Sequence, residues 1–496
     1  MNVAAMDHRR APLLEGLRRY RDAGMVPFST PGHKLGNGAD AELRELIGDI
    51  FLRSDIPLGG GVDDTHFRGE TLRAAEALGA DAWGAERSFY LVNGSSAGNH
   101  AYLLAALRPG DEVIVARDIH KSLLVALILT GARPVYVAPR LHPERSVGLG
   151  VNPADVAAAL AAHPAAKLVA LVSPSYCGVA SDLAGIVAVA HARGVPVYVD
   201  EAWGPHMGFH PDLPDSAMAS GADGAVVSTH KVLASLTQAA ILNVRGGRIA
   251  PDRVATMVGM AQTTSPSVPI LASIDACRRQ MALEGEALLE RTIALAEEAR
   301  RRLRELPGVE VLDAAALGLA GRSFDRTKLV IDVHGLGITG FEAEAVLRDR
   351  FGVAPEMSDL VGVVCLVTVG DTRERVERLV AAFAALAAER RPASRTIGAA
   401  MRSSGGVIAP GEQACSPREA FFAPSRAVPL AEAIGAVSAE LVIPYPPGIP
   451  VLAPGDVISG EKVAYLLEGA AHGMYLSGPV DPGLRTILVV EESGRV

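Results

Sequence analysis

The chain has 496 residues, of which 49 % are hydrophobic and 21 % are charged, and this size predicts two or three domains around a large core. A net charge of −9 and the lack of a long lysine and arginine run argue against a nucleic-acid-binding protein. With four scattered cysteines, no C-x-x-C pair, no signal-peptide pattern and no long apolar run, we expect a cytoplasmic protein that does not enter a membrane.

The first elements along the chain are an amphipathic helix at residues 1–24, a Pro/Gly-rich loop with T-P-G-H-K (30–34), and a helix at 70–78. From residue 87 onward, short apolar strands alternate with helices. Strands are expected at 88–92, 112–116, 134–137, 168–172, 195–199, 224–227 and 239–244, with helices at 99–107, 120–129, 153–162 and 184–192. This alternation predicts an α/β fold with a mostly parallel sheet and helices on both faces.

A long helix at 275–304 follows, and a second α/β unit comes after it. Its expected elements are strands at 327–333 and 363–368 and helices at 340–350 and 373–389. Residues 393–415 are rich in Pro, Gly and Ser and are predicted to form a linker. We therefore expect four parts: an N-terminal helix and loop segment (1–70), a large domain (71–305), a small α/β domain (306–395) and a C-terminal domain (396–496).

Polar residues follow five of the predicted strands, where ligands bind in parallel α/β sheets. These stretches read N-G-S-S-A-G-N (93–99), R-D-I-H (117–120), S-P-S-Y (173–176), D-E-A-W-G-P-H (200–206) and S-T-H-K (228–231). Scattered surface polarity would not readily produce five such clusters, so a binding or catalytic site is expected at this edge.

Each cluster has a structural interpretation beside a chemical one. The small residues of 93–99 suit either a helix cap or a phosphate cradle at a helix N-terminus. Asp200 ends a buried strand and is either a helix N-cap or part of a buried salt bridge, or it is the partner of a pyridinium nitrogen. Lys231 is either a loop-end lysine or an amine that forms an imine with an aldehyde. His120 is either an unremarkable helix start or a ring that stacks on a flat cofactor.

Together these groups are the ones that pyridoxal phosphate (PLP) needs, and their order suits the aminotransferase-like fold of PLP enzymes. Longer stretches make a resemblance specific. They are T-P-G-H-K (30–34), V-N-G-S-S-A-G-N (92–99), H-K-S (120–122), D-E-A-W-G-P-H (200–206), S-T-H-K-V-L-A-S-L-T-Q-A (228–239), T-T-S-P-S (263–267), G-D-T (370–372) and I-P-Y-P-P-G-I-P (443–450). On these motifs, which cover nearly the whole chain, the sequence resembles the bacterial ornithine/lysine/arginine decarboxylases, in the shorter form without an N-terminal wing domain.

The resemblance implies PLP-dependent fold type I, and it implies decarboxylation of a basic amino acid: arginine first, lysine or ornithine next, in polyamine-type metabolism. Lys231 looks like the Schiff-base lysine, Asp200 like the ring-nitrogen partner and His120 like the stacking residue, with His230 or Lys231 as proton donor. The implied cofactor-binding residues also include Ser95, Ser96, Ala97, Ala202, Trp203, Ser228 and His230. The family residue that matches Thr263 reaches the phosphate of the neighbouring subunit, which implies a homodimer or higher homo-oligomer with shared sites.

Two places depart from the family pattern and leave the substrate open. The segment 61–70, with Phe67 and Arg68, matches only loosely, and Cys177 stands where the family commonly has an aromatic residue.

The same residues also allow other functions, but the motifs support them less well. An aminotransferase, or a biosynthetic PLP enzyme for an unusual basic amino acid, would use the same lysine and aspartate. G-L-G-I-T-G (335–340) formally matches a dinucleotide-binding loop of a dehydrogenase, but no second strand ends in an acidic residue at the required distance, so a strand-to-helix turn capped by Thr339 is expected. H-M-G-F-H (206–210) has metal-ligand spacing, yet Gly208 and Pro211 argue against the helix it needs, and no metal is expected.

Overall fold

Seven strands form the main sheet of the computed structural model, which describes residues 6–63, 69–143, 145, 147–320, 322–389, 411–445 and 448–491. The predictions that concern Phe67, Arg68 and most of the linker 393–415 lie outside the described residues. The strands are β1 (Arg87–Leu91), β2 (Glu112–Ala116), β3 (Arg133–Val137), β4 (Leu168–Val172), β5 (Val197–Asp200), β6 (Gly224–Val227) and β7 (Ala240–Val244). Their hydrogen-bonded order is β1-β7-β6-β5-β4-β2-β3.

Strand β2 pairs in parallel with both β3 and β4, whereas β7 runs antiparallel to β1 and β6. The α/β fold with a mostly parallel sheet is thus confirmed, and the reversed β7 is an addition to it. The reversal follows from the connection, because a parallel return needs a crossover and residues 228–239 contain no helix.

The chain forms two compact units, which we describe separately. The first comprises residues 1–105, 200–211 and 216–289, and the second comprises 106–199, 212–215 and 290–496. The helices of the first unit are α1 (Pro12–Asp22), α2 (Ala41–Ile47), α3 (Asp49–Ser54), α4 (Glu70–Trp83), α5 (Gly94–Ala106), α9 (Pro251–Ala261) and the first part of α10 (Val268–Leu303), with a short π-helical turn η1 (Leu58–Val62). None of the described helices is both long and apolar enough to cross a bilayer.

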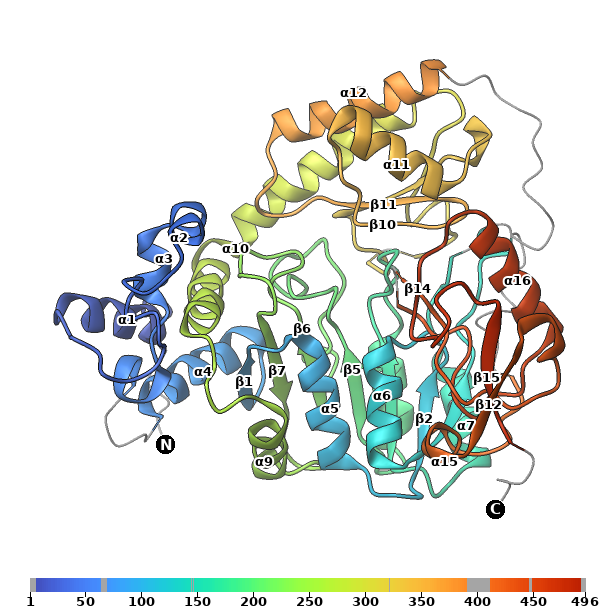
Figure 1. Cartoon of the computed structure of the whole chain (residues 1–496), viewed down its shortest axis with the longest axis horizontal. Helices are drawn as coiled ribbons and strands as arrows, with labels where there is room; N and C mark the ends of the chain where they lie inside the picture. Colours follow the sequence, from blue (N-terminus) through green and yellow to red (C-terminus); the bar gives the residue numbers. More distant parts are fainter. Residues whose placement is uncertain are drawn as a thin grey trace. The chain divides into compact units, whose positions relative to one another are not determined.

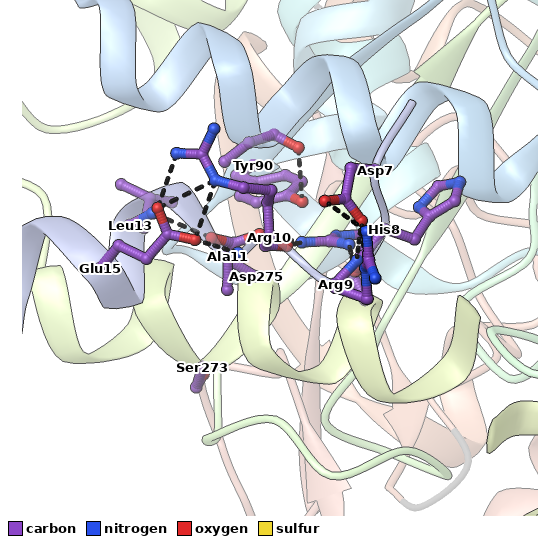
Figure 2. A network of polar contacts seen from close by, with 12 residues as sticks. Asp7, His8, Arg9, Arg10, Ala11, Leu13, Glu15, Tyr90, Ser273 and Asp275 are labelled. Carbon is purple, nitrogen blue, oxygen red and sulfur yellow. Dashed lines mark hydrogen bonds and ion pairs between the residues drawn. The ribbon is translucent and has the colours of Figure 1, made fainter. Parts of the chain in front are cut away.

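Helix α1 is shorter than the predicted helix and starts at Pro12, a residue suited to the first helical turn. The carboxylate of Asp275 on α10 accepts a hydrogen bond from the N–H of Leu13 at 2.9 Å, as Figure 2 shows, and so satisfies one free donor of that turn. Arg278 in turn binds Asp275 at 2.8 Å and donates to the carbonyl oxygen of His8 at 2.9 Å. These contacts attach the N-terminal segment to α10.

The second unit contains α6 (Lys121–Thr130), α7 (Pro153–Ala162) and α8 (Leu183–His191) beside the parallel strands. Next comes a four-stranded sheet in the order β10-β11-β9-β8, formed by β8 (Glu310–Leu312), β9 (Lys328–Asp332), β10 (Met357–Ser358) and β11 (Gly362–Leu366). Helices α11 (Gly340–Phe351) and α12 (Arg373–Glu389) lie on one side of β10 and β11 in Figure 1 and close an apolar core with them. A 3₁₀ turn η2 (His334–Leu336) precedes α11.

The last part of the chain has its own apolar core, built from buried side chains between Val428 and Val489. Its elements are α15 (Pro417–Phe422), β12 (Ser425–Pro429), η3 (Leu430–Glu432), β13 (Ile443–Pro444), α16 (Gly460–Ala471), β14 (Leu476–Ser477) and β15 (Thr486–Val490). Strands β12 and β15 pair antiparallel, as do β13 and β14.

Candidate active site

Two strand ends of the first unit meet at one edge of the sheet. Strands β1 and β6 both pair antiparallel with β7, so they run in the same direction and their carboxyl ends coincide. Leu91 lies opposite Ala240, and Val227 lies opposite Ile241, the next residue along β7. The segments that leave the sheet after residues 91 and 227 therefore begin at the same edge, one on each side of β7.

The segment after β1 is already helical. The structure starts α5 at Gly94, five residues before the predicted start, so Ser95, Ser96 and Ala97 occupy its first turn. Backbone N–H groups in a first helical turn have no acceptor within the helix, and the helix dipole is positive there. A helix of 13 residues that begins at this edge is therefore suited to bind a phosphate or another anion.

Close packing explains the small residues of this turn. A Cβ at Gly98 would lie 2.6 Å from Cγ2 of Val226 on β6, a distance that only glycine tolerates. The N–H of Gly94 also donates to the carbonyl oxygen of Gln238 at 2.9 Å. The helix start is thus fixed against both the strand and the segment that precedes β7.

Asp200 is buried at the end of β5, with 3 % of its surface exposed. Its carboxylate accepts hydrogen bonds from the side-chain amide of Asn99 at 2.8 Å and from the N–H of Ala202 at 3.1 Å. Burial raises the pKa of Asp200, while the charge of Lys231 and the two hydrogen bonds oppose that shift. A cation beside this carboxylate, such as a protonated ring nitrogen, would remove the cost of burying its charge.

Asn99 is a site residue that the sequence-based selection missed. It is fully buried on α5, one turn beyond Ser95 and Ser96, and it donates to Asp200. Its signal was its place in the motif 93–99, but the predicted helix started only at residue 99, so the sequence did not show that Asn99 shares a helix with Ser95 and Ser96.

Lys231 is half-buried, not a fully exposed surface lysine. Its Nζ lies 3.9 Å from the ring centroid of Trp203, so the ammonium sits over the indole face. The lysine also acts electrostatically on Asp200. An amine, an aromatic face and a carboxylate are thus close together in one unit.

Of the residues just before Lys231, Ser228 and Thr229 are buried and His230 is half-buried. The hydroxyl of Ser228 is fully enclosed and has no hydrogen-bond partner among the described residues, so a bound anion would satisfy it. His230 donates from Nδ1 to the carbonyl oxygen of Ala239 at 2.8 Å, which leaves Nε2 with its lone pair. Burial lowers the pKa of His230, and the charge of Lys231 acts in the same direction.

Thr263 follows Lys231 by more than 30 residues, and its described hydrogen bond is local. It is exposed just beyond α9, and its hydroxyl accepts a hydrogen bond from the N–H of Ser265 at 3.1 Å. The preceding residue, Gln262, binds the end of β1 through Val92 N–H at 3.0 Å and Tyr90 carbonyl oxygen at 3.3 Å. Gln262 thereby attaches the segment of Thr263 to the strand that leads into α5.

His120 belongs to the second unit, where it caps α6. Its Nδ1 accepts a hydrogen bond from the N–H of Ser122 at 3.2 Å and lies 2.8 Å from the Ser122 hydroxyl oxygen. A neutral ring in this arrangement carries its proton on Nε2. Cys177, the residue at the other departure from the family pattern, is also in the second unit, and burial raises the pKa of its thiol to about 12.

The donors of the first unit fit PLP group by group. The α5 N-terminus and the unsatisfied Ser228 hydroxyl suit a phosphate, Lys231 suits an aldehyde, and the buried Asp200 suits a pyridinium nitrogen.

The two rival motifs have structural explanations. Residues 335–340 form the turn into α11, and Thr339 and Glu342 make a reciprocal capping box at its start. A Cβ at Gly340 would lie 1.9 Å from the carbonyl oxygen of Gly362, so this glycine permits close packing. His206 and His210 are both buried in turns with no helix between them, and the described residues hold no cluster of metal ligands.

Similarity to known proteins identifies the family of this chain. Residues 11–320 match the family described as Orn/Lys/Arg decarboxylase, major domain, and residues 407–475 match its C-terminal domain. The chain belongs to the Orn/Lys/Arg decarboxylase family. It is accordingly an amino acid decarboxylase, as the sequence predicts.

Two relatives of this decarboxylase family match over almost their whole length. The arginine decarboxylase of Bacillus subtilis (strain 168) is 39 % identical over 490 residues, which cover 98 % of this chain and 99 % of the relative. The arginine decarboxylase of Halalkalibacterium halodurans is 40 % identical over 486 residues, which cover 97 % and 98 %.

Solved structures agree on the fold. The lysine decarboxylase LdcF of Francisella novicida superposes with a TM-score of 0.82 at 22 % identity, covering 97 % of this chain and 81 % of its own. An alanine–glyoxylate aminotransferase from Nostoc sp. reaches 0.51 at 17 % identity, covering 63 % and 85 %. The family member described here therefore has the aminotransferase-like fold type I.

Proposed function

We propose that the chain is a PLP-dependent arginine decarboxylase that converts arginine to agmatine and CO2 in the cytoplasm, as part of polyamine metabolism. Support for arginine comes from the relatives with that name, which are 37–40 % identical over 91–98 % of this chain. Lysine and ornithine are the next candidates within the family.

The observation that carries the proposal is the arrangement of Lys231 and Asp200 in the first unit. The carboxylate is buried and its pKa is raised, while the half-buried amine lies over the Trp203 indole nearby. An amine and a buried carboxylate in one site provide the two attachments that PLP requires.

The remaining cofactor contacts follow from the same site. We assign the phosphate to the first turn of α5, with Ser95, Ser96 and Ala97, and to Ser228 and His230. Ala202 and Trp203 border the site beside Asp200, since Ala202 donates to that carboxylate and Trp203 faces Lys231. His120 is the residue we assign to stack on the cofactor ring.

Four residues of the chain act in the proposed reaction. The chemistry that PLP would supply when bound is an electron sink for the pair left at Cα as CO2 leaves. Asp200 keeps the ring nitrogen protonated, because its buried carboxylate is stabilised by a cation. His120 would stack on the ring. Lys231 and His230 are the candidates for returning a proton to Cα, and the lowered pKa of His230 leaves its ring neutral near pH 7 and favours Lys231 as the donor.

We further propose that the enzyme is a homodimer with shared sites. Thr263 is exposed in the single chain, as expected of a residue that reaches a neighbouring subunit. Large apolar side chains are also exposed near the N-terminus, among them Phe28 at 96 %, Leu46 at 76 % and Ile50 at 79 %. Exposed apolar surface of this kind marks interfaces between proteins.

The division into four parts (1–70, 71–305, 306–395 and 396–496) also stays part of the proposal. It places the phosphate cradle, Asp200 and Lys231 in the large domain and leaves the small α/β domain and the C-terminal domain to complete the enzyme.

A substrate panel tests the function. The PLP-loaded protein is incubated separately with arginine, lysine and ornithine, and the released CO2, diamine or agmatine is measured together with any keto acid. We expect agmatine and CO2 from arginine in equal amounts, and none from the Lys231→Ala variant. Preferred turnover of lysine or ornithine, or keto acid as the main product, would overturn the assignment. A Lys167→Ala variant, which changes an exposed lysine, serves as the control.

A further inference from the structure

The loop that ends in His120 contacts a segment more than 300 residues later in the chain. Arg117 is buried and donates to the carbonyl oxygens of Pro450 at 2.6 Å and Val451 at 3.1 Å. Lys121, directly after His120, donates its backbone N–H to the carbonyl oxygen of Gly448 at 3.0 Å. All of these residues belong to the second unit.

Gly448 touches the His120 ring itself. A Cβ built on Gly448 would lie 2.9 Å from Cδ2 and 3.2 Å from Nε2 of His120, so a side chain at this position would collide with the ring. The backbone of Gly448 also has a φ of +94°, a conformation that favours glycine. Both the contact and the backbone conformation therefore require glycine here.

The opposite edge of the ring is held as well. Nδ1 lies across the ring from the Cδ2–Nε2 bond, and it is bound by the N–H of Ser122 at 3.2 Å. The ring thus has a hydrogen bond on one edge and the Gly448 backbone on the other, which restricts its rotation about χ2.

The segment that carries Gly448 is itself anchored. Asp456 binds Arg117 at 3.0 Å and the Lys462 ammonium of α16 at 3.2 Å, and all three side chains are buried. The Lys121 ammonium lies 4.9 Å from the ring centroid of Tyr445. Because breaking a buried charge pair is strongly destabilising, these contacts fix the segment relative to the loop.

We propose that Gly448 is a positioning residue, through which the C-terminal part of the chain holds the His120 ring in the orientation that stacks on the cofactor. This inference rests on the proposed function, in which His120 is the stacking residue. It assigns to the C-terminal part a role in cofactor binding that acts through His120 and needs no contact with the cofactor.

The test compares Gly448→Ala with Gly435→Ala. Gly435 has a similar φ of +86°, but a Cβ there would meet nothing within 4 Å, so the control carries the same backbone strain without touching His120. The first readout uses the cofactor-free protein and is deuterium exchange at Cε1 of each histidine ring, followed by mass spectrometry. The second is the rate at which PLP leaves the loaded protein.

A ring displaced from its rotamer is expected to change both readouts of Gly448→Ala by about two- to tenfold, the size typical of off-rotamer side chains. His120 should exchange faster and PLP should leave faster, while the other histidines and the Gly435→Ala variant match the wild type. Unchanged His120 exchange in a folded Gly448→Ala variant overturns the inference, as does an equal change in Gly435→Ala.

A measurement on the wild type covers the case in which Gly448→Ala does not fold. With histidine and glycine labelled selectively, the His120 Hδ2 proton should show a nuclear Overhauser effect to the α protons of Gly448, and its absence would overturn the inference. A failure of the proposed function gives a different result from a failure of this inference. In that case the wild type binds no PLP, but the His120–Gly448 contact is still observed.

Discussion

Lys231 and Asp200 are groups of opposite charge, and the carboxylate is buried whereas the amine is half-buried. Burial raises the pKa of Asp200, and the charge of Lys231 acts against this shift without cancelling it. The Trp203 face lies 3.9 Å from Nζ and offers the ammonium a second favourable contact. The contacts of Asp200 within the chain therefore do not fully offset the cost of burying its charge, and a protonated ring nitrogen beside it would offset more of that cost.

Glu201, the neighbour of Asp200, gives a pH-dependent prediction. It is 1 % exposed, accepts a hydrogen bond from the N–H of Ala217 at 2.8 Å, and burial raises its pKa to about 8. The folded protein thus keeps a proton on Glu201 up to about pH 8, whereas the unfolded chain releases it near the ordinary glutamate pKa of 4.5. The free energy of unfolding should fall between these values, by at most about 1.4 kcal/mol per pH unit.

Replacing Glu201 by Gln keeps an acceptor for Ala217 and removes the titration. We expect the free energy of unfolding of cofactor-free Glu201→Gln to fall less than that of the wild type between about pH 5 and pH 8, measured by urea unfolding. The exposed Glu286→Gln serves as the matched control and should follow the wild type. Parallel pH profiles for Glu201→Gln and the wild type would show that Glu201 does not carry the shift.

At the scale of single residues, the sequence indicated Asp200 and Lys231 as candidate site residues. Asp200 and Lys231 follow short apolar strands, and a charged group at such a place needs a partner or a function. Asn99 was not predictable in the same way, because its contact with Asp200 depends on a helix that starts at Gly94. Gln262 was hidden by sequence distance, since its partner Tyr90 lies 172 positions earlier.

At the scale of elements, α5 lies in close contact with the sheet through Gly98. A Cβ there would approach Val226 to 2.6 Å and Leu91 to 3.0 Å, so Gly98→Ala forces the helix and the strands apart. We expect a loss of about 1–3 kcal/mol in the free energy of unfolding, because overpacking outweighs the gain in helix propensity. Weaker PLP binding should accompany it, since the first turn of α5 moves with the helix.

Gly259 in α9 is the matched control for this variant. It is also a helical glycine, but a Cβ there meets nothing within 4 Å, so Gly259→Ala should increase stability by up to about 1 kcal/mol. Denaturant unfolding of both variants measures the difference. If Gly98→Ala is as stable as Gly259→Ala, the inference that α5 packs too closely against the sheet for a Cβ at position 98 is wrong.

Strands were easier to predict than the start of α5 or the direction of β7. The predicted strands at 112–116, 168–172 and 224–227 coincide with β2, β4 and β6, because short apolar runs bounded by polar residues mark buried strands. The turn 94–98 is rich in glycine and serine, which have low helix propensity, so only its packing against β6 reveals that it is helical. Helix propensity is a weak guide where tertiary contacts decide.

At the scale of the whole molecule, the exposed apolar residues of α2 and α3 predict a dimer. Leu46 and Ile50 are 76 % and 79 % exposed in the single chain, and burial in an interface would remove this apolar surface from water. We expect the wild type to have the mass of a dimer by light scattering, and Leu46→Glu combined with Ile50→Glu to have the mass of a monomer.

Leu467→Glu is the control for the dimer, since Leu467 is an exposed leucine on α16 in the C-terminal part. It should keep the dimer mass. A wild type that runs as a monomer, or a double variant that stays dimeric, would contradict the assignment of the interface to α2 and α3.

The central claim is that Lys231 holds PLP in the site formed by α5, Asp200 and Ser228. The most direct measurement is reduction of the PLP-loaded wild type with borohydride, followed by proteolysis and mass spectrometry of the peptides. Reduction makes the bond between the lysine and the cofactor permanent, so the labelled residue can be read from the fragment masses. We predict one phosphopyridoxyl group for each chain, carried by Lys231. A label on another lysine, or no label on a protein that turns over arginine, would contradict the account.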